Sequence, residues 1–340
     1  MKTWFKYVAI ACILFGLATP LRAQEVIVLS GLDETLAWLK SENWWGQEKH
    51  HEQLKVPHTM IVAISENWQK NASKLPVPTK KEIFYRFMLP LAVHANTMVL
   101  DRRARLKRLD TTLAGGSALS AEDDARLREA AVILRIASRE KMDQMTDSAA
   151  LRKIIGQALY KLDVIPAGLV LGQAAYESGY GTSRFAAEGN ALFGQWTFGG
   201  EGLVPEQQRK QLGDHRIAKF EWLFDSVRSY FLNLSSHPAY EDFRRLRAKL
   251  KAAGKPLRSL ELAEGLKSYS ERGQAYVDTL KGIIRVNGLD IADDAVFRDE
   301  PMRFVLNAAD QAAAAKLRKD IEAMRKSGEL AKIIKRMRLE

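Results

Sequence analysis

The stretch Leu169-Val-Leu-Gly-Gln-Ala-Ala-Tyr-Glu-Ser-Gly-Tyr-Gly181 places one carboxylate, Glu177, at the end of a segment that is otherwise almost wholly apolar. Pro166 suits the first turn of a helix, where a missing N–H costs nothing, and a glycine of Gly179-Tyr-Gly181 suits the left-handed residue that ends one. We therefore predict a helix over 166–178. Apolar side chains cover most of its circumference, which predicts a buried core helix rather than a surface helix.

The polar side chains Gln173 and Glu177 are four residues apart, so they share one helix face and can line one wall of a cleft. Burial disfavours a charged carboxyl group, and the negative end of the helix dipole does the same, so both effects raise the pKa of Glu177. A Glu that stays protonated near neutral pH is what a general acid for glycosidic cleavage requires. The alternative is a structural core Glu neutralised by an Arg or Lys.

Two spaced motifs give this region a family resemblance. Ala175-Tyr-Glu-Ser-Gly-Tyr-Gly181, followed by Asn190-Ala-Leu-Phe-Gly194, resembles the signature of the bacterial peptidoglycan glucosaminidases, in which a Glu-Ser-Gly-aromatic-Gly run precedes an Asn-x-Phe-Gly element. Upstream, the run from Leu75 to Pro90, with Asn96 and Arg102, resembles the Bax-like branch of that family. These domains are of the mannosyl-glycoprotein endo-beta-N-acetylglucosaminidase type, glycoside hydrolase family 73.

The resemblance covers residues 75 to 290 and implies that Glu177 is the acid catalyst acting on glycan strands of the cell wall. A glycosidase usually needs a second group that activates water or stabilises the oxocarbenium-like transition state. The carboxylates beyond the Asn-x-Phe-Gly element are the candidates for this group. They are Glu201, Glu206 and Glu221, and comparison with the family favours Glu206.

The segment Tyr269-Ser-Glu-Arg-Gly-Gln-Ala-Tyr276 resembles the paired tyrosines of the family's late motif. The resemblance implies that Tyr269 lies near the acid, where a phenol can bind an N-acetyl group or orient water. We therefore assign Tyr269 a catalytic role. The residues expected to contact sugar, by position in the motifs or by apolar ring contacts, are Gln173, Tyr180, Asn190, Phe193, Trp196 and Tyr276. Packing alone is the alternative explanation for the aromatic residues.

Residues 1–23 read as an export signal, with two lysines, an apolar run from Tyr7 to Ala18, and Leu21-Arg-Ala23 at the end. The run is too short for a comfortable membrane span, although an uncleaved leader would contact the inner membrane. Cys12, the only cysteine, lies inside this run. The exported chain would therefore contain neither a disulfide nor a cysteine metal site, and we expect it in the periplasm or cell envelope of a bacterium.

Removal of residues 1–23 takes away three basic residues and no acid, so the formal charge falls from +11 to +8. A basic surface favours anionic partners, namely the carboxylate-bearing wall polymer, acidic lipid headgroups or nucleic acid. Export makes nucleic acid the least favoured of these. We predict glycan strands of peptidoglycan as the partner, no nucleic acid, and a monomeric protein.

Helical patterns dominate residues 80–162, with a break at Gly115-Gly-Ser117 between helices over 80–109 and 121–141. Glycines and an extended pattern over 192–224 predict a small irregular β-lobe, and helices follow near 226–234, 240–252 and 271–286. The order helix, β-lobe, helices is that of a lysozyme-like architecture with a cleft between lobes. The fold class is mainly α, within α+β.

Four segments follow from this organisation. They are the signal 1–23, an N-terminal segment 24–75 without an assigned role, the glucosaminidase domain 76–290, and a basic helical tail 291–340 that resembles the end of a solute-binding domain.

Other signals for ligands are weak. The six histidines are dispersed without ligand spacing, so we predict no metal site, and Gly199-Gly-Glu-Gly202 lacks the Lys-Ser/Thr of a phosphate-binding loop. No cofactor is expected. The sequence thus predicts an exported endo-β-N-acetylglucosaminidase acting on peptidoglycan, with two alternatives. One is a lytic transglycosylase that leaves anhydro-muramyl ends, and the other is a non-catalytic scaffold that binds the wall.

Overall fold

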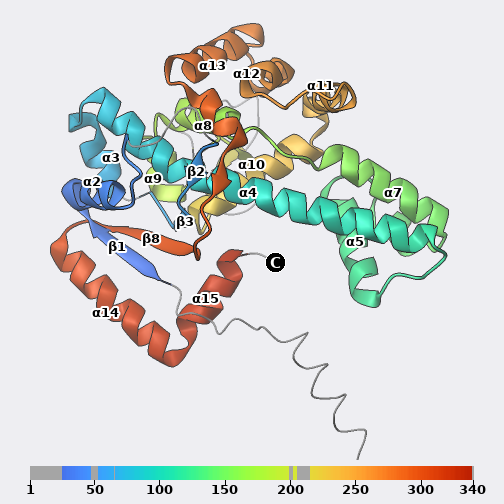
Figure 1. The fold of residues 1–340 in the computed structure, drawn as a ribbon, viewed down its shortest axis with the longest axis horizontal. Helices are drawn as coiled ribbons and strands as arrows, with labels where there is room; N and C mark the ends of the chain where they lie inside the picture. The colour runs from blue at the N-terminus through green and yellow to red at the C-terminus, as the bar shows by residue number, and fades with distance from the viewer. Residues whose placement is uncertain (1–24, 47–52, 65, 199–201, 205–214, 339–340) are drawn as a thin grey trace, which may run out of the picture.

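The structure is a computed structural model that describes residues 25–46, 53–64, 66–198, 202–204 and 215–338. Within these ranges the chain is mainly helical, and its short strands form small sheets (Figure 1). This confirms the predicted fold class, mainly α within α+β. The predicted export signal, with Cys12, lies outside the described residues.

The longest helix, α4 (Val77–Ala114), crosses the molecule and connects its helical groups (Figure 1). It begins three residues before the predicted start at Lys80, because Pro78 is accommodated in the first turn. One stretch of α4 has a mean hydropathy of 1.2, long and apolar enough to cross a membrane, but 61% of that stretch is buried inside the protein. Such burial is typical of a core helix.

The carboxyl-terminal half of α4 packs against α5 (Ala121–Ile133), α6 (Arg139–Asp143) and α7 (Ser148–Lys161). These helices and the second half of α4 form an arm, which a separate apolar cluster that includes Leu109 and Leu127 holds together. The arm therefore has its own small core, distinct from the one around the candidate site.

The sequence predicted one helix over 121–141, and this was wrong in its second half. α5 ends at Ile133, Arg135 takes a left-handed φ of 52°, and Ser138 caps α6 by accepting a hydrogen bond from the Lys141 N–H. A serine cap is a strong start signal. The continuous apolar pattern concealed it.

A second group of helices packs around α8 (Ala167–Ser178), in which every residue except Tyr176 and Glu177 is buried. This confirms the predicted core helix, with its start shifted by one residue. The predicted helices near 226–234, 240–252 and 271–286 correspond to α10 (Leu223–Ser236), α11 (Glu241–Ala252) and α13 (Gln274–Val286). The elements that follow α8 in this group are α9 (Arg184–Gly189), α10 (Leu223–Ser236), η3 (Pro238–Tyr240), α11 (Glu241–Ala252), α12 (Ser259–Leu262), η4 (Ala263–Tyr269), α13 (Gln274–Val286) and η5 (Leu289–Asp294).

The predicted β-lobe is present as a three-stranded antiparallel sheet in the order β4-β6-β5. β4 (Trp196–Phe198) and β5 (Gly202–Leu203) both pair with β6 (His215–Ala218). The strands are short, as the glycines of this segment predict.

Strands from distant parts of the chain meet in a second sheet. β1 (Val26–Ser30), β8 (Arg303–Ala308) and β3 (Thr59–Ile61) are parallel, with β8 in the middle. β2 (Lys55–Val56) pairs in parallel with β7 (Val296–Phe297). The N-terminal segment, which had no assigned role, thus builds one unit with the C-terminal tail. Its remaining elements are α2 (Gly31–Ser41), α3 (Glu66–Asn71) and η1 (Ala72–Lys74).

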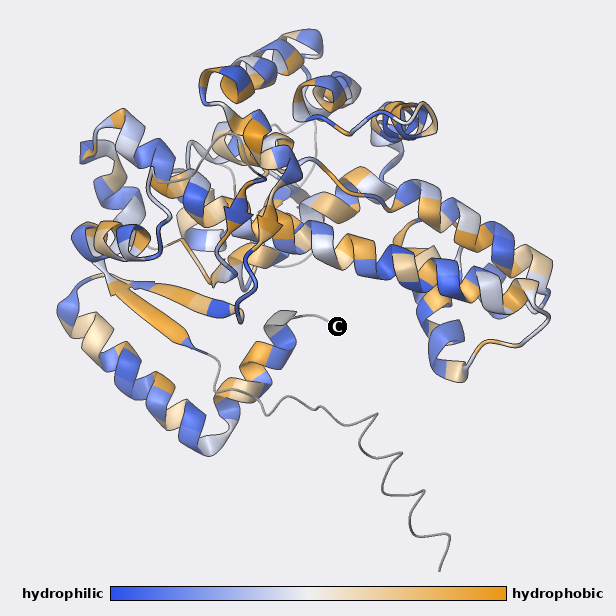
Figure 2. Ribbon diagram, viewed as in Figure 1, coloured by the Kyte–Doolittle hydropathy of each residue, from blue (hydrophilic) through white to orange (hydrophobic). Residues whose placement is uncertain are grey.

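The tail is not helical throughout, contrary to the prediction. It begins with β7 and β8, and only then come α14 (Gln311–Ser327), capped by Asp310, and α15 (Glu329–Arg338). β1 and β8 are hydrophobic along most of their length (Figure 2). A short apolar run of this kind cannot be told from a helix segment by periodicity. Only its pairing with the N-terminal strands identifies β8 as a strand.

Two glycines of α8 allow unusually close packing. A Cβ atom at Gly168 would lie 2.4 Å from the Leu289 carbonyl oxygen of η5, and one at Gly172 would lie 2.9 Å from Ile284 Cγ1 of α13. These positions are four residues apart and share a face of α8. Only glycine lets η5 and α13 lie this close to the helix that carries Glu177.

We therefore expect Gly168→Ala to destabilise the protein by about 1–3 kcal/mol, because the rigid backbone of η5 must move. Gly172→Ala should cost less, since the Ile284 side chain can yield. Gly156→Ala in α7 is the control: no atom lies within 4 Å of its Cβ position. It should stabilise the protein by about 0.5–1 kcal/mol through helix propensity. Urea denaturation measures all three, and equal effects at 156 and 168 would contradict this packing.

Candidate active site

The start of α8 is fixed to α4 by one side chain. Asn96 donates from Nδ2 to the Ile165 carbonyl oxygen at 2.7 Å and accepts from the Ile165 N–H at 3.0 Å. Pro166 follows as the residue before the first helical turn. Asn96, which belongs to the upstream part of the family resemblance, therefore anchors the candidate catalytic helix.

Two arginines hold the linker between α7 and α8. Arg247 is 1% exposed, and its guanidinium donates to the carbonyl oxygens of Tyr160, Lys161 and Asp163. Arg103 of α4 donates to the carbonyl oxygens of Leu159 and Leu162. Because buried carbonyl groups need donors, these bonds fix the approach of the chain to α8.

The end of α8 explains the Glu-Ser-Gly-Tyr-Gly motif. Gly179, Tyr180 and Gly181 all take left-handed conformations, with φ values of 58°, 62° and 73°. Ser178 Oγ accepts a hydrogen bond from the Gly181 N–H at 2.8 Å, and Trp68 Nε1 donates to the Tyr180 carbonyl oxygen at 3.0 Å. The glycines supply the conformation that ends the helix directly after Glu177, as the sequence predicted.

Glu177 is half-buried, and the Tyr276 hydroxyl donates to its Oε1 atom at 2.9 Å. Its other oxygen, Oε2, faces Gly194 of the motif, where a Cβ atom would stand 3.7 Å away. Burial raises the pKa of Glu177 above its ordinary value of 4.5, and the Tyr276 hydrogen bond lowers it by a smaller amount. The predicted upward shift in pKa is confirmed.

The alternative of a neutralising ion pair receives no support from the part of the chain that is described. Within those residues, no Arg or Lys forms a salt bridge with Glu177. Its surroundings are instead aromatic, with Tyr176 and Tyr276 in edge contact at 5.5 Å between ring centroids. A carboxyl group without a cationic partner favours the protonated form, as the general acid requires.

The late-motif tyrosines do lie beside the acid. Their rings are stacked at 5.6 Å with an interplanar angle of 14°. Tyr276, rather than Tyr269, contacts Glu177, while the Tyr269 hydroxyl donates to the Phe193 carbonyl oxygen at 3.0 Å. Tyr269, to which we assigned a catalytic role from the sequence, therefore connects η4 to the Asn-x-Phe-Gly element. The role of Tyr269 in catalysis stays a prediction.

Three residues predicted to contact sugar have side chains that do not reach the surface. Gln173 is 0% exposed, Tyr276 is 1% exposed, and Phe193 is 2% exposed. Phe193 instead stacks on Tyr230 at 4.2 Å between centroids. The prediction of direct sugar contact by these side chains was wrong, because helical periodicity places a residue on a face without revealing what covers that face.

Asn190 and Tyr180 also interact mainly with protein. The Asn190 amide accepts from the Ile64 N–H at 3.3 Å and donates to the Phe220 and Glu221 carbonyl oxygens. Asn190 also stands one residue further from the phenylalanine than in the Asn-x-Phe-Gly element. The Tyr180 ring packs against aromatic rings and lysines of α4. Packing therefore accounts for much of both residues, and because both are only half-buried, their contact with sugar stays a prediction.

Several predicted residues lie outside the described part of the chain. Glu206 and Glu201 are among them, and of Trp196 only the backbone, in β4, is described. The third candidate for the second catalytic group, Glu221, is exposed and lies 3.8 Å from Arg336 of α15. The identity of the second group therefore stays a prediction.

Tyr230 of α10 is the residue of this site that the sequence did not single out. It is 0% exposed and hydrogen-bonds Gln173. Its position on the apolar face of a predicted helix is indistinguishable from that of a packing residue. Only its hydrogen bond to Gln173, which lies four residues before Glu177 in α8, distinguishes Tyr230 from a packing residue.

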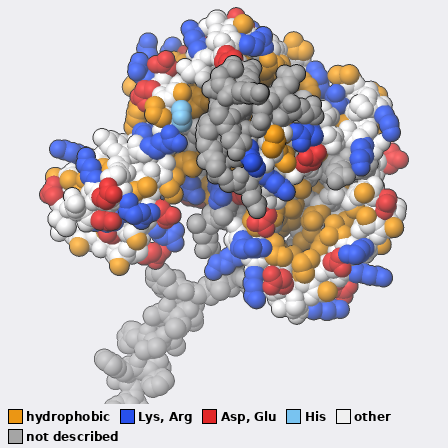
Figure 3. All heavy atoms as spheres, turned by 180° about the vertical axis from the view of Figure 1, so that it is seen from behind, with side chains coloured by type: hydrophobic (Ala, Val, Ile, Leu, Met, Phe, Trp, Pro, Cys, Tyr) orange, Lys and Arg blue, Asp and Glu red, His pale blue; other side chains and the backbone are white. Residues whose placement is uncertain are grey.

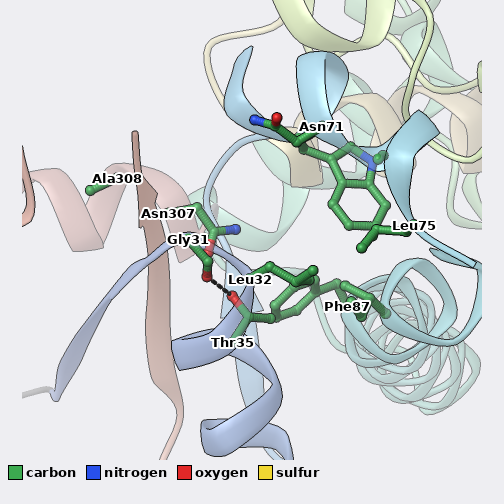
Figure 4. Close-up of a pocket in the computed structure, with 11 residues that line it drawn as sticks. Gly31, Leu32, Thr35, Asn71, Leu75, Phe87, Asn307 and Ala308 are labelled. Carbon is green, nitrogen blue, oxygen red and sulfur yellow. Dashed lines mark hydrogen bonds between the residues drawn. The ribbon is translucent and has the colours of Figure 1, made fainter. Parts of the chain in front are cut away.

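A recess of about 100 Å³ lies away from Glu177, between α2, α3, η1, α4 and the end of β8 (Figure 4). Its lining includes Leu32, Phe87 and Asn307, and the Thr35 hydroxyl in its wall donates to the Gly31 carbonyl oxygen at 2.8 Å. Neither Glu177 nor its tyrosines line it. The recess therefore lies between α4 and the unit built from the N-terminal segment and the tail.

Charged side chains of both signs are interspersed over the face seen in Figure 3. Among the described residues there is no group of three or more His, Cys, Asp or Glu side chains placed to hold a metal ion.

Comparison with known proteins agrees with these motifs. The sequence model of the family described as mannosyl-glycoprotein endo-beta-N-acetylglucosaminidase matches residues 153–289. Protein bax of Escherichia coli (strain K12) is 31% identical over 209 residues, which cover 61% of this chain and 70% of that protein. The chain belongs to the Bax-like glucosaminidase-domain family. No solved structure matches it.

Family membership supports a glycosidase-like role on peptidoglycan. The matched range begins in α7 and ends at the start of η5, so it contains α8, the β-lobe and α13. Every contact of Glu177 described above lies inside it. The unit built from β1, β3 and β8 lies outside this range.

We expect Glu177→Gln to leave the protein as stable as wild type or more stable at neutral pH. A carboxyl group whose pKa is raised by folding contributes stability that is present at low pH and lost as the pH rises through its folded pKa. Gln keeps an oxygen for the Tyr276 hydrogen bond but cannot ionise. The melting temperatures of the two proteins should therefore converge at acidic pH. A clear loss at neutral pH would indicate a structural ion pair instead.

Proposed function

We propose that this protein is an exported peptidoglycan hydrolase that cleaves the β-1,4 bond on the reducing side of N-acetylglucosamine. The observation that supports this best is Glu177, a half-buried carboxyl group with a raised pKa at the end of a buried helix. Among the described residues its hydrogen-bonding partner is the phenol Tyr276 rather than a cation. Membership of the glucosaminidase family supplies the substrate class.

In this proposal Glu177 donates its proton to the glycosidic oxygen as the bond from that oxygen to the anomeric carbon breaks. Water then adds to the anomeric carbon and loses a proton to Glu206 or, where the acetamido group of the substrate assists, to the Glu177 carboxylate. The products are a free reducing end and a sugar hydroxyl. Tyr276 donates to the carboxylate that forms on Glu177, which stabilises it until the next proton arrives.

We also propose that the protein is located in the periplasm or cell envelope. The sequence of residues 1–23 supports export to the periplasm, and the formal charge of +8 without them suits an anionic wall polymer. Contact with the inner membrane would follow if the leader stays attached.

Glu177→Gln should lower the rate of peptidoglycan digestion by about 10²–10⁴-fold, the usual contribution of a general acid. The measurement is the release of soluble fragments from purified sacculi, followed by mass spectrometry of the new ends. New reducing ends on N-acetylglucosamine support the proposal. Anhydro-muramyl ends would identify a lytic transglycosylase, and binding without release would identify a scaffold. Undiminished digestion by the variant would refute the role of Glu177.

The rate should fall as the pH rises through the pKa of Glu177, because only the protonated form can donate. Burial raises that pKa above 4.5, so the alkaline limb should lie above the ordinary range of a glutamate. Initial rates on soluble wall fragments across the pH range measure this limb. A rate that still climbs well above neutral pH would contradict the assignment.

A further inference from the structure

A line of hydrogen bonds runs through the core beneath Glu177. The Tyr230 hydroxyl donates to Gln173 Oε1 at 2.5 Å, and Gln173 Nε2 donates to the Tyr276 hydroxyl oxygen at 2.9 Å. Tyr276 in turn donates to Glu177 Oε1 at 2.9 Å. The exposed fractions of Tyr230, Gln173 and Tyr276 are 0%, 0% and 1%. Solvent therefore does not compete for these bonds.

Tyr230 determines the direction of this line. A buried hydroxyl has to donate its proton, and within the described residues Gln173 Oε1 is the acceptor that the Tyr230 hydroxyl has. The amide oxygen of Gln173 is thereby held toward α10, so its NH2 group points at Tyr276. The Tyr276 oxygen is already an acceptor, and its own proton is left for Glu177.

The opposite direction would have a different chemical result. If the Gln173 amide were reversed, Tyr276 would donate to Gln173, and Glu177 would have to donate its own proton to Tyr276. The proton of Glu177 would then be engaged in a hydrogen bond to Tyr276 and would not be available to the substrate. The observed direction avoids this, because Oε1 only accepts.

We propose that Tyr230 and Gln173 are positioning residues that act through Tyr276. They reserve Oε1 of Glu177 as an acceptor and leave Oε2, on the side of Gly194, to carry the proton that reaches the glycosidic oxygen. This inference rests on the proposed role of Glu177 as the acid and specifies which of its oxygens acts.

The other titratable groups around this line do not obscure its effect. Burial raises the pKa values of Tyr230, Tyr240, Tyr269 and Tyr276, so all four phenols stay protonated through the working pH range. The nearby cation Arg272 binds the hydroxyl of Tyr176, on the outer side of α8. A shift of the alkaline limb in variants of this line therefore reports on Glu177.

The test is Tyr230→Phe, which removes one hydroxyl and frees the Gln173 amide to reverse. We expect kcat to fall about tenfold at unchanged KM, and the alkaline limb to move about one pH unit upward, since Glu177 loses a donor to its ionised form. Tyr240→Phe is the matched control. It removes another buried phenol hydroxyl near Tyr269 that, within the described residues, forms no hydrogen bond to this line. The alkaline limb of this variant should stay in place.

Tyr276→Phe and the double variant Tyr230→Phe/Tyr276→Phe complete a double-mutant cycle. If Tyr230 acts through Tyr276, the double variant will have the limb of Tyr276→Phe alone, because the second change has nothing left to alter. Additive shifts, or a lower kcat at Tyr230→Phe with the limb unmoved, would overturn the proposal in favour of a packing role. Circular dichroism establishes that each variant is folded.

A second readout does not depend on catalysis. Carbon-13 NMR of labelled glutamate, assigned with Glu177→Gln, follows the titration of Glu177 directly in Tyr230→Phe and in Gln173→Met. Tyr230→Phe should show an upward shift, whereas Gln173→Met has no amide oxygen that could take the Tyr276 proton and should titrate close to wild type. An unchanged titration in Tyr230→Phe, or an equal shift in both variants, would refute the inference. If Glu177→Gln digests peptidoglycan normally, the proposed function fails instead. The two failures are thus distinguishable.

Discussion

The close contact of α8 with η5 and α13 is the constraint on which the candidate site depends. Gly168 and Gly172 let the backbone of η5 and the side chains of α13 approach α8 without an intervening Cβ atom. This approach brings Tyr276 within hydrogen-bonding distance of Glu177 and places Gln173 between two phenols. Asn96 and Arg247 fix the chain that leads into α8, so the helix has little freedom to move away. The absence of side chains at Gly168 and Gly172 thus allows α8 to be held by contacts both at its start and beside Glu177.

Two buried arginines of this protein have partners of a different kind from that of Glu177. Arg244 is 1% exposed and binds Glu241 at 2.7 Å as well as backbone carbonyl oxygens. Arg247 also has backbone acceptors along its guanidinium group. In the part of the chain that the structure describes, Glu177 is bonded by a phenol, where a structural carboxylate would have a cation. Keeping such a group half-buried costs stability, which is the usual sign that a residue serves chemistry rather than folding.

How much the sequence predicted depended on how local each signal was. Pro166 and Gly179 set the ends of α8 by local backbone geometry, and the glutamate stood out against an apolar helix, so both the element and its acid followed from nearby residues. Gln173 was expected on a surface, because periodicity assigns a face but not its cover, and α10 and α13 supply that cover from far along the chain. β8 was missed for a similar reason. Its apolar run is ambiguous until Val26–Ser30 is seen to pair with it.

The place of β8 has a consequence for the order in which this protein can assemble. β1 and β3 lie close in sequence yet do not pair with each other, since β8 stands between them. Until residues 303–308 have been synthesised, both strands expose unsatisfied edges, which are hazards for association with other chains. Closing this sheet brings together residues nearly 280 positions apart, an entropically slow step. A chain still being synthesised would therefore contain all of α8 while β1, its first strand, had not yet paired.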